Sequence, residues 1–176
     1  LPGDAAFPAY GLWPTSAMFT YAGEWRILHA EEGRVWTVAL PASAGSLVAR
    51  LPDGLLLQRD GALWLRRWDA RGDEKIRDFP CESCEGYSYR ERVFLMTRGT
   101  READSKYRCR IFVMGFPSRE LHEIPSPMER CLGGSLHDCH GAVGLISCWT
   151  EHDNWTGLID LRTGKLQKLP LRLEWD

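Results

Sequence analysis

The sequence of 176 residues lacks two features that would point to particular partners: a strong net charge and long apolar runs. Its net charge is −2 and its isoelectric point is near 6.2, and the arginine-rich middle is interleaved with acids, so no surface for nucleic acid is indicated. Apolar runs such as Ile111–Met114 fall far short of the roughly 20 residues that a transmembrane helix needs. We therefore expect neither a nucleic-acid partner nor a membrane span.

The chain also lacks helical periodicity and the short motifs of common catalytic sites. Residues 23–32 could form a short helix, but Gly33 closes them and an aromatic-rich strand pattern follows, so we interpret them as a strand. There is no Gly-x-Ser-x-Gly motif, and Ser135, His137 and Asp138 are too close in sequence to face one another as a triad. The sequence predicts no helix of three turns and no catalytic residue.

Short apolar segments separated by turn residues fill the chain from residue 17 onward. They predict about fourteen strands, one of them over residues 87–97. The dipeptides Asp53-Gly54 and Asp60-Gly61 are hairpin signals because glycine readily adopts positive φ. The hydrophobic content of 44% is sufficient for a core. Residues 1–16 combine prolines with small residues. We expect an N-terminal arm over 1–16 and one all-β domain over 17–176.

A repeat organises these strands. Residues 154–170, NWTGLIDLRTGKLQKLP, predict a strand, a turn at Thr163-Gly164, a second strand and a closing proline. Residues 34–41, 62–80 and 106–125 resemble this unit, and the closing prolines at 41, 80, 125 and 170 lie 39, 45 and 45 residues apart. A repeat of about 40–45 residues built from short strands is typical of a β-propeller blade. Four blades fit, the first without a recognisable outer strand, as a complete ring or part of a larger one.

Three motifs resemble the blades of known repeat families. Residues 160–165, DLRTGK, are similar to the D-x-x-T-G-K turn between the last two strands of pyrroloquinoline-quinone-type and WD-type propeller blades. Residues 68–72, WDARG, resemble the W-D-x-x-G form of this turn, and residues 51–57, LPDGLLL, resemble the first hairpin. The resemblance covers about residues 43–171 and implies a propeller. The Gly-His dipeptide of WD repeats and the regular tryptophan of quinone-type repeats are absent, so no cofactor is implied.

Aromatic and arginine side chains in the predicted loops are the candidate binding residues: Trp13, Trp68, Arg71 and Trp155. These residue types dominate binding energy at protein interfaces, although Trp68 and Trp155 flank strands and could instead pack between blades. We interpret the chain as a non-catalytic module that binds a protein partner. The eight tryptophans keep a carbohydrate-binding propeller as an alternative, and self-association could complete a ring.

Cysteine and histidine form two groups after successive closing prolines: Cys81 and Cys84, then Cys131, His137, Cys139 and His140. Four such side chains could bind zinc, which leaves a metal-dependent enzyme as a further alternative. We favour disulfide bonds, because the six cysteines are even in number and the sequence Asn154-Trp155-Thr156 fits an N-glycosylation acceptor. Both features point to a secreted or extracytoplasmic protein, and we expect no cofactor other than this zinc.

Overall fold

The computed structural model describes residues 16–21, 24–31, 33–69, 72–81, 83–98, 100–101, 107–125, 133–140, 142–149, 154–160 and 162–170. These residues are almost entirely β-strands, and the one helical element among them is the short 3-10 helix η1 (Ala42–Ala44). A search of the described residues for a helix able to cross a bilayer finds none.

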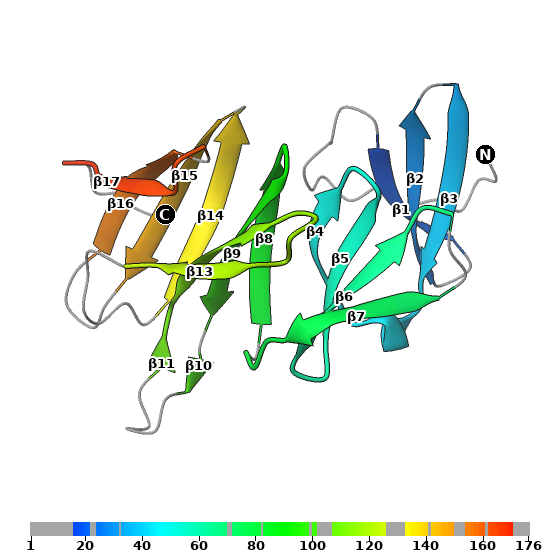
Figure 1. The fold of residues 1–176 in the computed structure, drawn as a ribbon, viewed down its shortest axis with the longest axis horizontal. Helices are drawn as coiled ribbons and strands as arrows, with labels where there is room; N and C mark the ends of the chain where they lie inside the picture. Colours follow the sequence, from blue (N-terminus) through cyan, green and yellow to red (C-terminus); the bar gives the residue numbers. More distant parts are fainter. Residues whose placement is uncertain are drawn as a thin grey trace.

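Four antiparallel sheets follow one another along the chain, and we call them blades 1 to 4 (Figure 1). Blade 1 has three strands, β1 (Ser16–Tyr21), β2 (Glu24–Glu31) and β3 (Arg34–Leu40). Blade 2 contains β4 (Ser46–Leu51), β5 (Gly54–Arg59), β6 (Ala62–Arg67) and β7 (Asp73–Asp78). Blade 3 contains β8 (Ser83–Tyr89), β9 (Arg92–Arg98), β12 (Ile111–Gly115) and β13 (Leu121–Ile124), with the hairpin β10 (Thr100–Arg101) and β11 (Tyr107–Arg108) inserted. Blade 4 contains β14 (Gly133–His140), β15 (Val143–Trp149), β16 (Asn154–Asp160) and β17 (Lys165–Lys168).

The predicted repeat is confirmed. Each blade ends just before a closing proline: Pro41 follows β3, and Pro80, Pro125 and Pro170 follow β7, β13 and β17. Residues 23–32 are also confirmed as strand rather than helix, since β2 covers most of them. Residues 87–97, predicted as one strand, instead form the hairpin of β8 and β9. Arg90, in the turn of this hairpin, has a φ of 53°. Glycine or asparagine at this position would have indicated a turn in the sequence, whereas arginine does not.

Among the described residues, the strand that blade 1 lacks is the inner one, which corrects the expectation that the outer strand is absent. The Arg50 guanidinium, near the end of β4, lies 3.0 Å from Nδ1 of His29, near the end of β2. His29 also stacks on Trp68, directly after β6. Because β4 and β6 are the first and third strands of their blade, β2 runs in the direction of a third strand. The strands β1, β2 and β3 therefore occupy the second, third and fourth positions.

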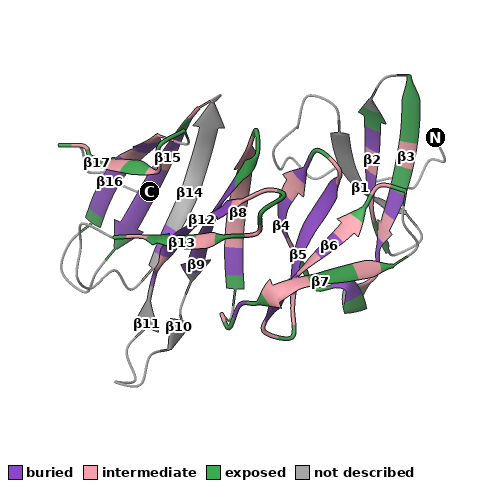
Figure 2. Cartoon of the chain, in the orientation of Figure 1, coloured by how far each residue is buried: buried purple, intermediate pink, exposed green. Residues whose placement is uncertain are grey.

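The core lies between blades, and the central strands of blades 2 and 3 have two buried faces (Figure 2). In β5, Leu55 and Leu57 face blade 1, whereas Leu56 packs into the cluster between blades 2 and 3. In β9, Leu95 packs towards blade 2 and Phe94 packs towards blade 4. Neighbouring residues of a strand point to opposite sides of the sheet, so apolar runs such as 54–57 are explained by blades stacking face to face.

Blades 1 and 4 lie at opposite ends of the molecule, with blades 2 and 3 between them (Figure 1). The described residues therefore form an open row of blades rather than a closed ring of four. The strands β4 and β8 lie side by side in the middle of this row, as do β8 and β14. Of the two alternatives that the sequence left open, the arrangement matches part of a larger propeller.

A partly buried ion cluster holds the outer strand of blade 2 against its neighbours. The Asp73 carboxylate, 9% exposed, accepts hydrogen bonds from Arg66 at 2.6 and 3.0 Å and from Arg59 at 3.0 Å. The hydrogen bonding of Arg66, and secondarily of Arg59, holds the pKa of Asp73 below its usual value despite its burial. Arg66 also donates to the Ala39 carbonyl of β3 at 2.6 Å, so the cluster links blades 1 and 2.

Candidate binding surface

One end of the blades carries all the turns that join first to second strands and third to fourth strands. We call it the turn end; it is the upper edge of the molecule in Figure 1. The neighbouring blades bring these turns together although they are far apart in sequence. Two groups of aromatic and arginine side chains lie there, one at blades 1 and 2 and the other at blades 3 and 4.

The first group is built on Trp68, one of the residues predicted from the sequence. Its indole N–H donates to the Pro52 carbonyl at 2.9 Å, which fixes the ring beside the β4–β5 turn. The ring stacks on His29 with a centroid distance of 4.2 Å, and Trp36 stacks on the same imidazole at 5.4 Å. His29 is fully buried, whereas Trp36 and Trp68 are half-buried, so the indole rings form the accessible part of this stack.

Arg50 completes the first group through a hydrogen bond to His29. Its guanidinium donates to Nδ1 of His29 at 3.0 Å and lies 6.0 Å above the Trp68 ring. The stack therefore presents one cation and two indole rings at the turn end, a combination that suits protein interfaces.

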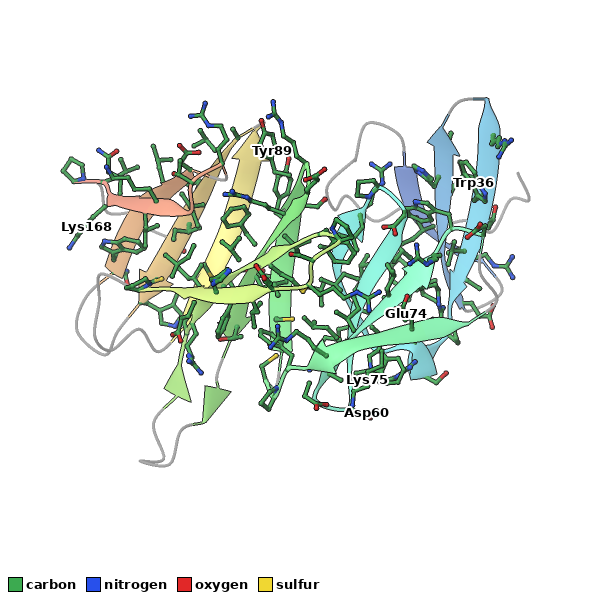
Figure 3. All side chains as sticks on the ribbon, in the orientation of Figure 1. Trp36, Asp60, Glu74, Lys75, Tyr89 and Lys168 are labelled. Carbon is green, nitrogen blue, oxygen red and sulfur yellow. The ribbon has the colours of Figure 1, made fainter. Side chains whose placement is uncertain are left out.

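The second group consists of arginines at the turns of blades 3 and 4. Arg90 and Arg92 belong to the β8–β9 turn, and the Arg90 guanidinium lies 5.3 Å above the ring of Tyr89. Arg162, in the β16–β17 turn, donates from Nε and Nη2 to the Asp160 carboxylate at 3.1 and 3.2 Å. This pairing lowers the pKa of Asp160 and raises that of Arg162. Tyr89, at the upper edge in Figure 3, marks the position of this group.

The other predicted binding residues have different outcomes. Trp13 and Arg71 lie outside the described residues. Trp155 is corrected from a surface residue to a core residue: it is 1% exposed and packs between blades 3 and 4. It is the second residue of β16, on the side of the strand that faces blade 3. The alternative that the sequence left open for Trp155 is therefore the one found.

Of the two cysteine and histidine groups, only Cys81 and Cys84 have described side chains. Cys81 is half-buried and Cys84 is buried, and their thiols hydrogen-bond to each other immediately before and at the start of β8. Cys131 lies outside the described residues, and of His137, Cys139 and His140 only the backbone is described, in the second half of β14.

The backbone places Cys84 and the described part of the second group on adjacent strands. The strands β8 and β14 run in the same direction, as first strands of adjacent blades (Figure 1). Cys84 is the second residue of β8 and Cys139 the seventh of β14, so about 15 Å of extended chain separates their levels. The zinc site expected from the sequence stays a prediction. Among the residues whose side chains are described, no group of three potential metal ligands occurs.

Comparisons with known proteins agree with this architecture. No family model matches the sequence, and neither does any curated protein. Among solved structures, the crystal structure of TolB from Acinetobacter baumannii superposes with a TM-score of 0.57, at 11% sequence identity. The fold is that of a β-propeller. The match covers 88% of this chain and 40% of the TolB chain, so this chain spans well under half of that protein.

Sequence reasoning missed most of the residues that form the two groups. His29, Trp36 and Arg50 lie on three strands and meet Trp68 only because blades 1 and 2 stack. No motif marks them, because they are separated by up to 39 residues of chain. The arginines have one local signal, a run of charged residues at 90–92 between apolar strand segments, which could have identified the β8–β9 turn.

Proposed function

We propose that this chain is a non-catalytic β-propeller module that binds a protein partner through its turn end. The observation that carries the proposal is the gathering of Trp36, Trp68 and Arg50 at one side of this end, and of Tyr89 and three arginines at the other. Tryptophan, tyrosine and arginine are the residues that contribute most at protein interfaces. The fold likeness to TolB supports the scaffold, and the stacked blades hold the turns in fixed positions.

The same residues favour binding over catalysis. His29 is fully buried and accepts a hydrogen bond from Arg50, so it has no access to a substrate. The carbohydrate-binding alternative loses one of its candidate residues, because Trp155 is buried. The metal-dependent enzyme has less support, because Cys84 and Cys139 lie at different positions along their strands. We further propose a secreted or extracytoplasmic location, which rests on the even number of cysteines and the sequon at Asn154.

Site-specific photo-crosslinking tests the proposed surface. A photoreactive phenylalanine analogue is placed at Asp69, exposed at the turn end, and in a matched variant at Asp78, exposed at the far end of β7. We expect a protein adduct from position 69 and none from position 78, in cells that produce the chain in its native compartment. Equal adducts from both positions, or none from 69, would show that the turn end is not the interface.

Two further measurements separate the alternatives. A glycan array probed with the purified chain should show no binding, and a specific glycan signal would replace the protein-binding proposal. Purified protein should turn over no substrate. An activity that is abolished by Cys81→Ala or His137→Ala would establish the metal-dependent enzyme instead.

A further inference from the structure

Two adjoining hollows lie where blades 3 and 4 meet at the turn end. The first, with a volume of about 390 Å³, is lined by Tyr89, Arg90, Glu91, Arg92 and Arg162. Four of these residues come from the β8–β9 turn and the fifth from the β16–β17 turn, 70 residues beyond Arg92. Neither turn could form this hollow alone, so it exists only because the two blades are adjacent.

The arginines of this hollow are held in place by contacts within the protein. Arg162 is fixed by its two hydrogen bonds to Asp160, and Arg92 donates through Nη1 to the Arg162 carbonyl. Arg90 lies over the Tyr89 ring and makes no hydrogen bond or ion pair with the described residues. Guanidinium groups that are already positioned lose less conformational entropy when they bind a ligand.

The second hollow, of about 490 Å³, shares Arg92 with the first and has an apolar wall. Val113, Ile124 and Pro125 of blade 3 form this wall, and the Thr163-Gly164 turn of blade 4 closes the other side. The remaining lining residues are Gly115 and the polar residues Ser118, Glu120, His122 and Glu123. The two hollows together offer a cationic site beside an apolar one, on either side of Arg92.

We propose that this pair of hollows binds an acidic peptide segment of the partner, with a carboxylate at the arginines and an apolar side chain against Val113 and Ile124. The proposal rests on the proposed function and names the chemistry of the partner. An arginine fork matches the two oxygens of a carboxylate, and three guanidinium groups line the first hollow. An adjoining apolar wall suits the alternation of side chains in an extended peptide.

The local charge favours a carboxylate over a phosphate group. The three arginines are partly balanced by Glu91, which lines the same hollow, and by Asp160, which is paired with Arg162. A ligand group with a single negative charge is attracted, whereas a dense polyanion also meets these two carboxylates. Beyond Arg92, the second hollow adds two further carboxylates, those of Glu120 and Glu123. We therefore assign the site to glutamate or aspartate side chains.

Fluorescence anisotropy with a synthetic peptide tests the assignment. The probe is a labelled peptide of alternating glutamate and leucine, and its control replaces every glutamate by glutamine. We expect binding of the acidic peptide alone. Arg92→Ala, at the junction of the hollows, should weaken binding about tenfold or more, since it removes a charge-assisted contact. Arg34→Ala, an exposed arginine of the β2–β3 turn in blade 1, is the matched control and should leave binding unchanged.

Glu91→Gln keeps the test decisive if an arginine variant folds poorly. Removing this like charge should strengthen binding of the acidic peptide several-fold, a gain that loss of structure cannot produce. Equal binding of the glutamine peptide, equal weakening by Arg34→Ala, or displacement by millimolar inorganic phosphate would overturn the assignment. If crosslinking from position 69 succeeds while the acidic peptide fails to bind, the protein-binding proposal stands and this inference alone falls.

Discussion

Replacement of Trp155 by alanine should lower the free energy of unfolding of this protein, because this side chain belongs to the core and not to a binding surface. The indole is 1% exposed, and it packs with Phe94, Ile146 and Ile159 between blades 3 and 4. Truncating a buried tryptophan leaves a cavity and typically costs about 3–5 kcal/mol. This is a large fraction of the roughly 5–15 kcal/mol that stabilises an ordinary domain. We expect the urea midpoint of unfolding to fall sharply.

Phenylalanine at the same position should be tolerated far better. The indole N–H of Trp155 is buried and has no hydrogen-bond partner, and an unsatisfied buried donor costs about 1–3 kcal/mol. Trp155→Phe removes this cost while it loses part of the ring volume, so the two effects oppose each other. We expect a net loss of about 1 kcal/mol or less from these terms. An exposed residue would show little difference between alanine and phenylalanine.

Trp149 provides the matched control for this experiment. It lies on the neighbouring strand, directly opposite Asn154, and is 41% exposed. Trp149→Ala should cost about 1 kcal/mol or less, as surface substitutions usually do. Far-UV circular dichroism reports unfolding of all these variants without depending on tryptophan emission. Equal destabilisation by Trp149→Ala and Trp155→Ala would refute the placement of Trp155 between the blades.

Three further predictions follow from individual contacts. Gly164→Val should destabilise by about 1 kcal/mol or more, because Gly164 has a φ of 73°, whereas Gly72→Val, at an open site without positive φ, should cost less in the same urea titration. The pKa of Asp73 in the folded protein is lowered from 3.8, so Asp73 adds stability above pH 3.8 that is lost as the pH falls through the lowered pKa. In Asp73→Asn, the unfolding midpoint should therefore vary less with pH between pH 5 and about pH 2. In material kept free of reductant, Cys81 and Cys84 should resist alkylation under denaturing conditions. Six reactive thiols would contradict the disulfide, and stoichiometric zinc would replace it with a metal site.

The disulfide is not formed in the structure, where Cys81 and Cys84 are free thiols, so it stays a prediction. The two thiols have a clear order of reactivity. The hydrogen bond from Cys84 lowers the pKa of the Cys81 thiol, whereas the same contact and burial raise that of Cys84. In the reduced protein we therefore expect a maleimide reagent to modify Cys81 before Cys84. Mass spectrometry of the native protein after partial modification identifies the thiol that has reacted. Modification of Cys84 first would contradict this order.

Local chemistry made most of the strands predictable. The turn at Thr163-Gly164 and the dipeptide Asp60-Gly61 were identified from residues that tolerate positive φ, and Asp60, Gly61 and Gly164 have φ values of 51°, 67° and 73°. Gly54 has a different role from the one its hairpin signal suggests, because a Cβ there would lie 2.2 Å from the Arg66 carbonyl oxygen. The β8–β9 turn was missed because Arg90, at its centre, is not a turn residue by composition.

The candidate site was predictable only in fragments. Trp68 was identified from its position after a strand. The other rings of its stack, His29 and Trp36, lie 39 and 32 residues away in the chain. Trp155 shows a related limit. The alternation of side chains along β16 places Trp155 on one face of the strand but does not indicate whether another blade covers that face. Burial by a neighbouring sheet is a property of the stack and not of the strand.

The sequence alone determined the class of fold, the period of the blades and the turns within them, because these depend on backbone preferences over a few residues. The tertiary structure decided what the blades bring together. Blade stacking buries Trp155, and the common direction of β8 and β14 separates Cys84 from Cys139. The same stacking places Arg92 beside Arg162. Contacts between residues distant in the chain depend on how whole sheets pack, and no short stretch of sequence contains that information.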